Sequence, residues 1–235
     1  MKKGDLRKQE ILQTAETLFC QKGYEETSVQ DILDILKTSK GSFYHHYVSK
    51  EALLEAICRK RAEEQFRRVT AALSQGNDGI PEQVNGLLSG MIPFRQEKPA
   101  FLLMLLPTFR LPEGRTVKAA YCDALADLFR DRLADTLHEG TTQGELLCGD
   151  PAVAAEICMT LVNRLWMSLC EMMLDAEEAG EPADPGETLH LTAQYRSMLE
   201  RSLTLPFGCL ELVNIPALKS LAEQIHAAWN RRRLG

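Results

Sequence analysis

The sequence predicts an all-α protein with a small N-terminal helical domain followed by a larger helical domain. Apolar residues recur at helical spacing through most of the 235 residues. No segment alternates between apolar and polar residues, and no Asn-Gly or Asp-Gly pair joins two strand-like runs. With 45% hydrophobic residues, the chain is apolar enough to bury a sizeable core.

The first predicted helix covers about residues 5–21. Its apolar residues between Ile11 and Phe19 are spaced so that they lie on one face of a helix, and Gly23 follows the last turn. Glycine just beyond a helix end is typical of a C-terminal cap. We expect this helix to pack across the next two and complete a three-helix domain.

Two short helices are predicted within residues 27–51, TSVQDILDILKTSKGSFYHHYVSKE. Thr27 or Ser28 can cap the first of them, with Gln30 or Asp31 three residues later as in a capping box. The second begins after the break at residues 37–38, with Ser39 as its cap, and ends near Tyr47. It carries small, basic and hydrogen-bonding residues where a core helix would carry leucine or isoleucine. This pattern predicts a helix-turn-helix with a recognition helix.

Long helices are predicted for the rest of the chain. The first of them covers about residues 50–74 and would span roughly 35 Å at about 1.5 Å per residue, too long for a small domain to bury alone. The later ones cover about residues 80–93, 96–107, 114–139, 150–177, 186–204 and 216–233. Helix 150–177 is apolar around most of its circumference, which indicates cover on several sides. Residues 205–235 either cap the helical body or extend a dimer.

Two stretches of the N-terminal part carry a resemblance to a known family. RKQEILQTAETLFCQKGYEETSVQDI and SKGSFYHHYVSKEALL resemble the TetR family of bacterial transcriptional regulators, over about residues 5–65. The sequence departs from the family at the turn, where Lys37 replaces the usual glycine, so we expect some backbone strain or an altered turn there. The resemblance implies a DNA-binding domain at 5–65 and an effector-binding and dimerisation domain at 66–235.

The resemblance implies contact with a double-stranded DNA operator. We expect Lys40, Ser42 and His45 to reach base edges, with Gly41 allowing close approach of the backbone. The remaining DNA-binding candidates would hold phosphates or cap the recognition helix: Thr27, Ser28, Gln30, Ser39, Tyr44, His46 and Lys50. The alternative interpretation of all these residues is a solvated polar face.

The resemblance also implies a homodimer built from helices 150–177 and 186–204, and a two-fold dimer goes with a palindromic operator. A small-molecule effector would bind in the C-terminal domain and release DNA. Candidate lining residues are Met91, Phe94, Phe101, Met104, Phe109, Arg164, Trp166 and Cys170. Each apolar candidate fits the plain core as well. Arg164 would pair an anionic ligand, belong to a buried ion pair or lie at the dimer edge.

The net charge of −6 is unevenly divided. Residues 1–61 carry 11 Lys or Arg against 9 Asp or Glu, and the remainder carries 16 against 24. The basic balance of the N-terminal part permits a phosphate partner, since the local face matters more than the sum. Motifs of nucleophile elbows, phosphate loops and zinc proteases are absent, so we expect no enzyme. We expect no cofactor and no metal, because the adjacent His45 and His46 point about 100° apart on a helix.

The seven cysteines are scattered singly, which favours reduced thiols in the cytoplasm. No signal peptide and no membrane-spanning run is recognised. The leading interpretation is a ligand-responsive repressor. The alternatives are an activator or co-regulator on the same fold, a ligand-binding module or enzyme with a vestigial motif, and a redox variant acting through Cys20 or Cys58.

Overall fold

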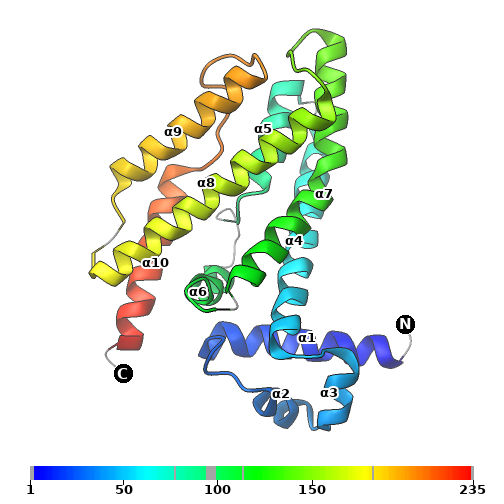
Figure 1. Ribbon diagram of the computed structural model, residues 1–235, viewed down its shortest axis with the longest axis vertical. Helices are drawn as coiled ribbons and strands as arrows, with labels where there is room; N and C mark the ends of the chain where they lie inside the picture. The colour runs from blue at the N-terminus through cyan, green and yellow to red at the C-terminus, as the bar shows by residue number, and fades with distance from the viewer. Residues whose placement is uncertain (1–2, 77, 94–98, 113, 182, 234–235) are drawn as a thin grey trace. The chain divides into compact units, whose positions relative to one another are not determined.

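The computed structural model describes residues 3–76, 78–93, 99–112, 114–181 and 183–233. Over these ranges the regular secondary structure consists of ten helices (Figure 1), which confirms the predicted all-α class. The helices are α1 Lys3–Lys22, α2 Val29–Leu36, α3 Lys40–His46, α4 Lys50–Gln75, α5 Ile80–Gly90, α6 Pro99–Thr108, α7 Gly114–Gln143, α8 Pro151–Ala179, α9 Pro185–Ser202 and α10 Ile215–Arg233.

The chain forms two compact units. The first contains residues 1–62 and 100–124, and the second contains residues 63–99 and 125–235. Helices α4 and α7 each contribute residues to both units. The first unit therefore includes α6 and the beginning of α7 in addition to the predicted helix-turn-helix. The predicted domain division at residue 65 stays a prediction.

Helix α1 belongs to the first unit, and α2 packs against it. Its inward residues, from Ile11 to Phe19, are buried, and the Tyr24 ring meets the Phe19 ring edge-on at a centroid distance of 5.2 Å. Gly23 follows the helix with φ 97°, a left-handed conformation in which glycine avoids the cost of a Cβ. The turn at Gly23 therefore brings Tyr24 back onto α1, where its ring covers the end of the buried face.

In the second unit α8 and α9 pack side by side, and α5 and α10 also contact α8 (Figure 1). An aspartate followed by proline starts both α8 and α9. Asp150 accepts hydrogen bonds from the amides of Ala152 and Val153, and Asp184 accepts one from Gly186. Proline at the first helical position needs no partner for its nitrogen, so the Asp-Pro pair is a strong start signal. Gly180 ends α8 with φ 76°.

Two helices predicted to end at residues 107 and 139 extend further, so that a proline and a glycine lie inside them. Pro107 is in the last turn of α6, and Gly140 lies within α7, which continues to Gln143. At Gly140 an added Cβ would approach a side-chain carbon of Ile80 to 2.5 Å and Leu146 to 2.9 Å. The glycine therefore permits close packing of α7 rather than ending it.

Helix α8 is long and apolar enough, by length and composition, to cross a membrane, although 44% of its most apolar stretch is buried within the chain. The core helix of a soluble protein meets the same test. Its packing against α5, α9 and α10 explains the apolar composition.

Candidate nucleic-acid interface

Helix α2 begins with a complete capping box. Ser28 Oγ accepts a hydrogen bond from the Asp31 amide at 3.1 Å, and the Asp31 carboxylate accepts one from the Ser28 amide at 2.8 Å. Of the predicted caps, Ser28 is the one used, paired with Asp31. The hydrogen bonds from the Ser28 amide and hydroxyl, with a further one from Lys22, lower the pKa of Asp31. The start of α2 is thus fixed by its own sequence.

The turn between α2 and α3 contains a strained lysine. Lys37 has φ 48° and ψ 48°, in the left-handed region. Its amide and that of Thr38 both donate to the carbonyl of Leu33, which closes the end of α2. A left-handed conformation costs a residue with a Cβ about 1–2 kcal/mol. The backbone keeps the turn that glycine would adopt, and Lys37 bears the strain that the sequence predicted.

Helix α3 is short and anchored by one aromatic residue. Ser39 caps it, with Oγ accepting from the Ser42 amide at 3.3 Å. Phe43 is fully buried, while the neighbouring Tyr44 is 52% exposed and meets the Phe43 ring edge-on. Tyr47, after the last turn, is buried and donates to the Lys8 carbonyl on α1 at 3.4 Å. Two aromatic anchors thereby hold α3 and leave its other side exposed.

We call the exposed side of this helix the α3 face. Its members are Ser39, Lys40, Gly41, Tyr44 and His45, with Ser42 and His46 half-buried beside them. No acidic side chain lies within α3 itself. The face offers one ammonium, several hydroxyls and two imidazoles, which are the groups that contact phosphates and base edges.

Gly41 has no packing role within the chain. An added Cβ would meet only Ser39 Oγ, at 3.9 Å, which is ordinary contact. Its backbone is helical, so no left-handed conformation requires glycine either. Glycine in a helix costs up to about 1 kcal/mol relative to alanine. Neither packing nor backbone conformation requires glycine at residue 41. A residue without a side chain here suits a partner molecule that comes close to the backbone of α3.

The start of α4 holds Lys50 in a defined position. Its Nζ lies 3.3 Å from the Glu25 carbonyl oxygen and 4.2 Å from the centroid of the Tyr24 ring. The Tyr24 hydroxyl donates to the Glu51 carboxylate at 3.2 Å. Hydrogen bonds from the Glu51 amide and from Ser49 lower the pKa of Glu51, with a smaller contribution from Tyr24. Tyr24 and Glu51 are thus positioning residues that were absent from the predicted site.

Thr27 and Gln30 are the predicted site residues that the structure makes least available for DNA. Thr27 is fully buried, and its hydroxyl donates to the Gly23 carbonyl at 2.8 Å. Gln30 is exposed, but its amide nitrogen donates to Asp34 at 2.7 Å, so a carboxylate lies beside it. The other nine candidates are exposed or half-buried on α3 and at the starts of α2 and α4. A buried threonine was not foreseeable from its position in a polar run.

The predicted effector residues are divided between the two units. Phe101, Met104 and Phe109 are buried in the first unit, whereas Met91, Trp166 and Cys170 are buried in the second. Arg164 is exposed and forms an ion pair with Glu171 at 3.7 Å. Phe94 lies outside the described residues. This set of lining residues stays a prediction.

Cys20 and Cys58 are the cysteines proposed for redox sensing, and they differ in burial. Cys58 is fully buried, and burial raises the pKa of its thiol far above the ordinary range, so the reactive thiolate is suppressed. Cys20 is half-buried. Among the described residues, no three His, Cys, Asp or Glu side chains are placed to hold a metal ion.

Residues 11–57 match the family model of bacterial regulatory proteins of the tetR family. The HTH-type transcriptional regulator YuxN of Bacillus subtilis is 43% identical over 67 residues, which are 28% of this chain and 23% of that protein. The transcriptional repressor KstR2 of Mycolicibacterium smegmatis is 28% identical over 147 residues, 59% of this chain and 66% of that protein. The matched region thus covers less than two thirds of either relative.

The fold is also similar to that of a solved structure. A TetR-family transcriptional regulator from Pectobacterium atrosepticum superposes with a TM-score of 0.56 at 16% identity, over 88% of this chain and 100% of that one. At this identity the likeness concerns the fold alone. It extends beyond the N-terminal match to the helices that follow.

Proposed function

The chain belongs, through its N-terminal helices, to the TetR family of bacterial regulatory proteins, and we propose that it is a dimeric transcriptional regulator that binds operator DNA. The observation that carries the proposal is the α3 face, an exposed polar side on a helix fixed by two aromatic anchors. The relative KstR2 is a repressor, which favours repression over activation here.

The recognition helix would lie in the major groove. Lys40 is the first residue of α3, and a lysine at that place can donate to guanine O6 and N7. Ser42 and His45 would contact neighbouring base edges. Ser28, Ser39, Tyr44, His46 and Lys50 would contact phosphates and fix the register. The Asp34 carboxylate beside Gln30 makes that residue a weaker phosphate ligand.

Dimerisation would use the exposed apolar residues of α8 and α9. Val153 and Ile157 on α8 and Leu189 and Met198 on α9 are each 50–53% exposed, although they are apolar. Val153 and Ile157 are four residues apart and share one helix face. A second copy covering this face would form a four-helix interface, and its two-fold symmetry would match a palindromic operator.

A small-molecule effector would release the DNA by shifting a population. Such a molecule must bind the DNA-incompetent conformation more tightly, and the ratio of its two affinities limits the change in operator affinity. A protein that acts on DNA in this way would function in the cytoplasm, without a catalytic step.

Binding to DNA is tested by fluorescence anisotropy on labelled DNA from upstream of the protein's own gene, with a scrambled duplex as control. We expect preferential binding whose affinity falls steeply with salt, because lysines displace counterions from phosphates. Equal affinity for both duplexes at every salt concentration would reject a sequence-specific regulator.

The lysines of α3 and α4 are expected to have different roles. Lys40→Ala should weaken operator binding about 10- to 100-fold and relax the sequence preference, since a good base contact contributes about 1–3 kcal/mol. Lys50→Ala should weaken all DNA alike and reduce the salt slope by about one. Anisotropy on operator and scrambled duplexes measures both effects. Arg130→Ala, an exposed cation of the second unit, is the matched charge control. Equal losses on both duplexes for Lys40→Ala would contradict its role in reading bases.

Gly41→Ala is expected to separate folding from binding. The methyl group has space within the chain, so thermal stability should stay equal or rise by up to about 1 kcal/mol. Operator affinity should fall about tenfold, because the methyl group occupies the place of the approaching DNA backbone. Differential scanning calorimetry and anisotropy measure the two quantities. Unchanged affinity would mean that DNA does not approach α3 at this residue.

A further inference from the structure

A cavity lies in the second unit, and none of the predicted effector residues is among those that line it. It has a volume of about 180 Å³ and is formed by Met173 at the end of α8, residues 183–188 at the start of α9, and the first three turns of α10. Met173, Ala183, Pro185, Ile215, Leu218 and Ala222 give it an apolar wall. An apolar cavity of about 150 Å³ holds a benzene molecule, so this volume suits one ring or a short aliphatic chain.

A second, much smaller cavity adjoins the first. The two share Met173, Ala183 and Ala222, and the smaller has a volume of about 10 Å³. This is the space of a single water-sized group. Its wall includes Glu177 and His226, so its chemistry is polar where that of the larger cavity is apolar.

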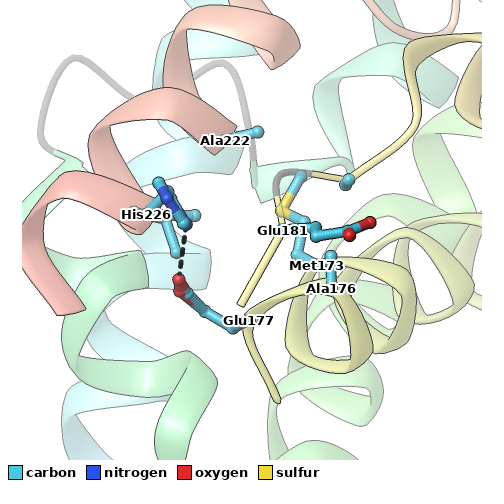
Figure 2. A pocket seen from close by; sticks show the side chains of 8 residues that line it. Met173, Ala176, Glu177, Glu181, Ala222 and His226 are labelled. Carbon is cyan, nitrogen blue, oxygen red and sulfur yellow. Dashed lines mark hydrogen bonds and ion pairs between the residues drawn. The ribbon is translucent and has the colours of Figure 1, made fainter. Parts of the chain in front are cut away.

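The polar end is built around a buried carboxylate. Glu177 is 3% exposed, and its Oε1 lies 2.8 Å from Nδ1 of His226 on α10. Figure 2 shows the Glu177 carboxylate directed at the His226 ring, with Met173 on the neighbouring turn of α8. Glu181 also lines this end, but it is exposed, and its carboxylate is drawn pointing away from the pair (Figure 2). A buried carboxylate accepts hydrogen bonds and attracts positive charge.

The larger cavity has one positive and one negative side chain in its wall, so their charges cancel. Lys219 and Glu223 are both exposed on α10, four residues apart, and both line the larger cavity. The remaining polar group of that wall is the hydroxyl of Thr188, which donates to the Asp184 carbonyl at 2.9 Å. The larger cavity thus has an apolar wall with one cation and one anion on it, whereas the wall of the smaller one contains the Glu177 carboxylate and its partner His226.

We propose that these adjoining cavities bind a small lipophilic amine, with its ammonium group beside Glu177 and an apolar body of about one ring between Met173, Leu218 and Ala222. The proposal is independent of DNA binding, since every lining residue belongs to the second unit. Because the wall combines α8, α9 and α10, a bound ligand would also tie the C-terminal helix to the rest of its unit.

Isothermal titration calorimetry of the full-length protein with 2-phenylethylamine tests the proposal. The anion 3-phenylpropanoate and the neutral 2-phenylethanol have similar bodies and isolate the effect of charge. We expect the amine to bind at least about tenfold tighter than either, a difference of about 1.4 kcal/mol. Equal affinity for the amine and the anion, or no binding of the amine at millimolar concentration, would overturn the proposal.

Variants locate the site. Glu177→Gln keeps the shape of the side chain and should remove the advantage of the amine, whereas Glu145→Gln, an exposed glutamate before α8, should leave it unchanged. Ala222→Leu adds bulk to the wall that the two cavities share and should weaken the binding of all three probes. If Glu177→Gln impairs folding, methyl NMR of the wild-type protein replaces it. The amine should shift the Met173 methyl signal, assigned with Met173→Leu, and a shift confined to other methionines would reject this site.

Discussion

Replacing Ile157 by aspartate is expected to produce monomers and to lower operator affinity by more than about 100-fold. The side chain is 50% exposed on α8, beside Val153 at 53%. In the proposed dimer each carboxylate would be buried opposite an apolar surface, and the cost of burying an unpaired charge exceeds what such an interface gains. A monomer binds one half-site and loses the avidity of two linked recognition helices, which is worth about 10²–10⁴ in affinity.

Sedimentation velocity measures the dimer and anisotropy measures the operator affinity. Ile157→Val is the matched control, because it keeps an apolar β-branched side chain at the same place and should leave both quantities close to wild type. The Asp variant should fold, since half of the side chain is exposed within one chain. A dimeric Ile157→Asp protein with normal operator binding would show that α8 does not form the interface.

The starts of α2, α3, α8 and α9 could be predicted because their signals are local. Ser28, Ser39, Asp150 and Asp184 each cap a helix through a hydrogen bond to an amide within three residues. In α8 and α9 a proline follows the cap, and Gly180 ends α8. The strain at Lys37 was equally visible, because one missing glycine in a turn has a direct backbone consequence. Prediction worked where cause and effect lie within one turn of helix.

Burial and contacts between distant residues could not be predicted from the sequence pattern. Thr27 belongs to the same polar run as Ser28, yet it is fully buried, and its hydroxyl donates to the Gly23 carbonyl. The proposed amine site combines Glu177 and His226, which are 49 residues apart, and no spacing rule connects them. The apolar effector candidates were chosen by composition, and residues buried in a core have the same composition. Sequence patterns indicate which side chains face inward but not which of them meet.

The same limit applies to the charged residues of the first unit, where Glu16 supports our last prediction. Glu16 lies on α1 with a side chain that is 8% exposed, and it forms ion pairs with Arg61 and, at 3.2 Å, with Lys60, both on α4. The Arg61 side chain is 15% exposed, and its guanidinium carbon lies 5.4 Å from the centroid of the Phe101 ring on α6. One buried carboxylate therefore joins α1 to α4, and Arg61 extends the contact to α6.

Glu16→Ala is expected to destabilise the first unit by about 3 kcal/mol, because it removes one partner of a buried pair and leaves the Arg61 charge behind. Urea denaturation followed by far-UV circular dichroism measures the loss. Both tryptophans, Trp166 and Trp229, belong to the second unit, so tryptophan fluorescence reports that unit separately. The urea midpoint measured by dichroism should fall, while the midpoint measured by fluorescence changes less.

The double variant Glu16→Leu/Arg61→Met removes both charges and should recover most of the lost stability, since an apolar pair can replace a buried ion pair at little cost. A loss below about 1 kcal/mol for Glu16→Ala, or a double variant as unstable as the single one, would mean that the pair does not hold α1 to α4.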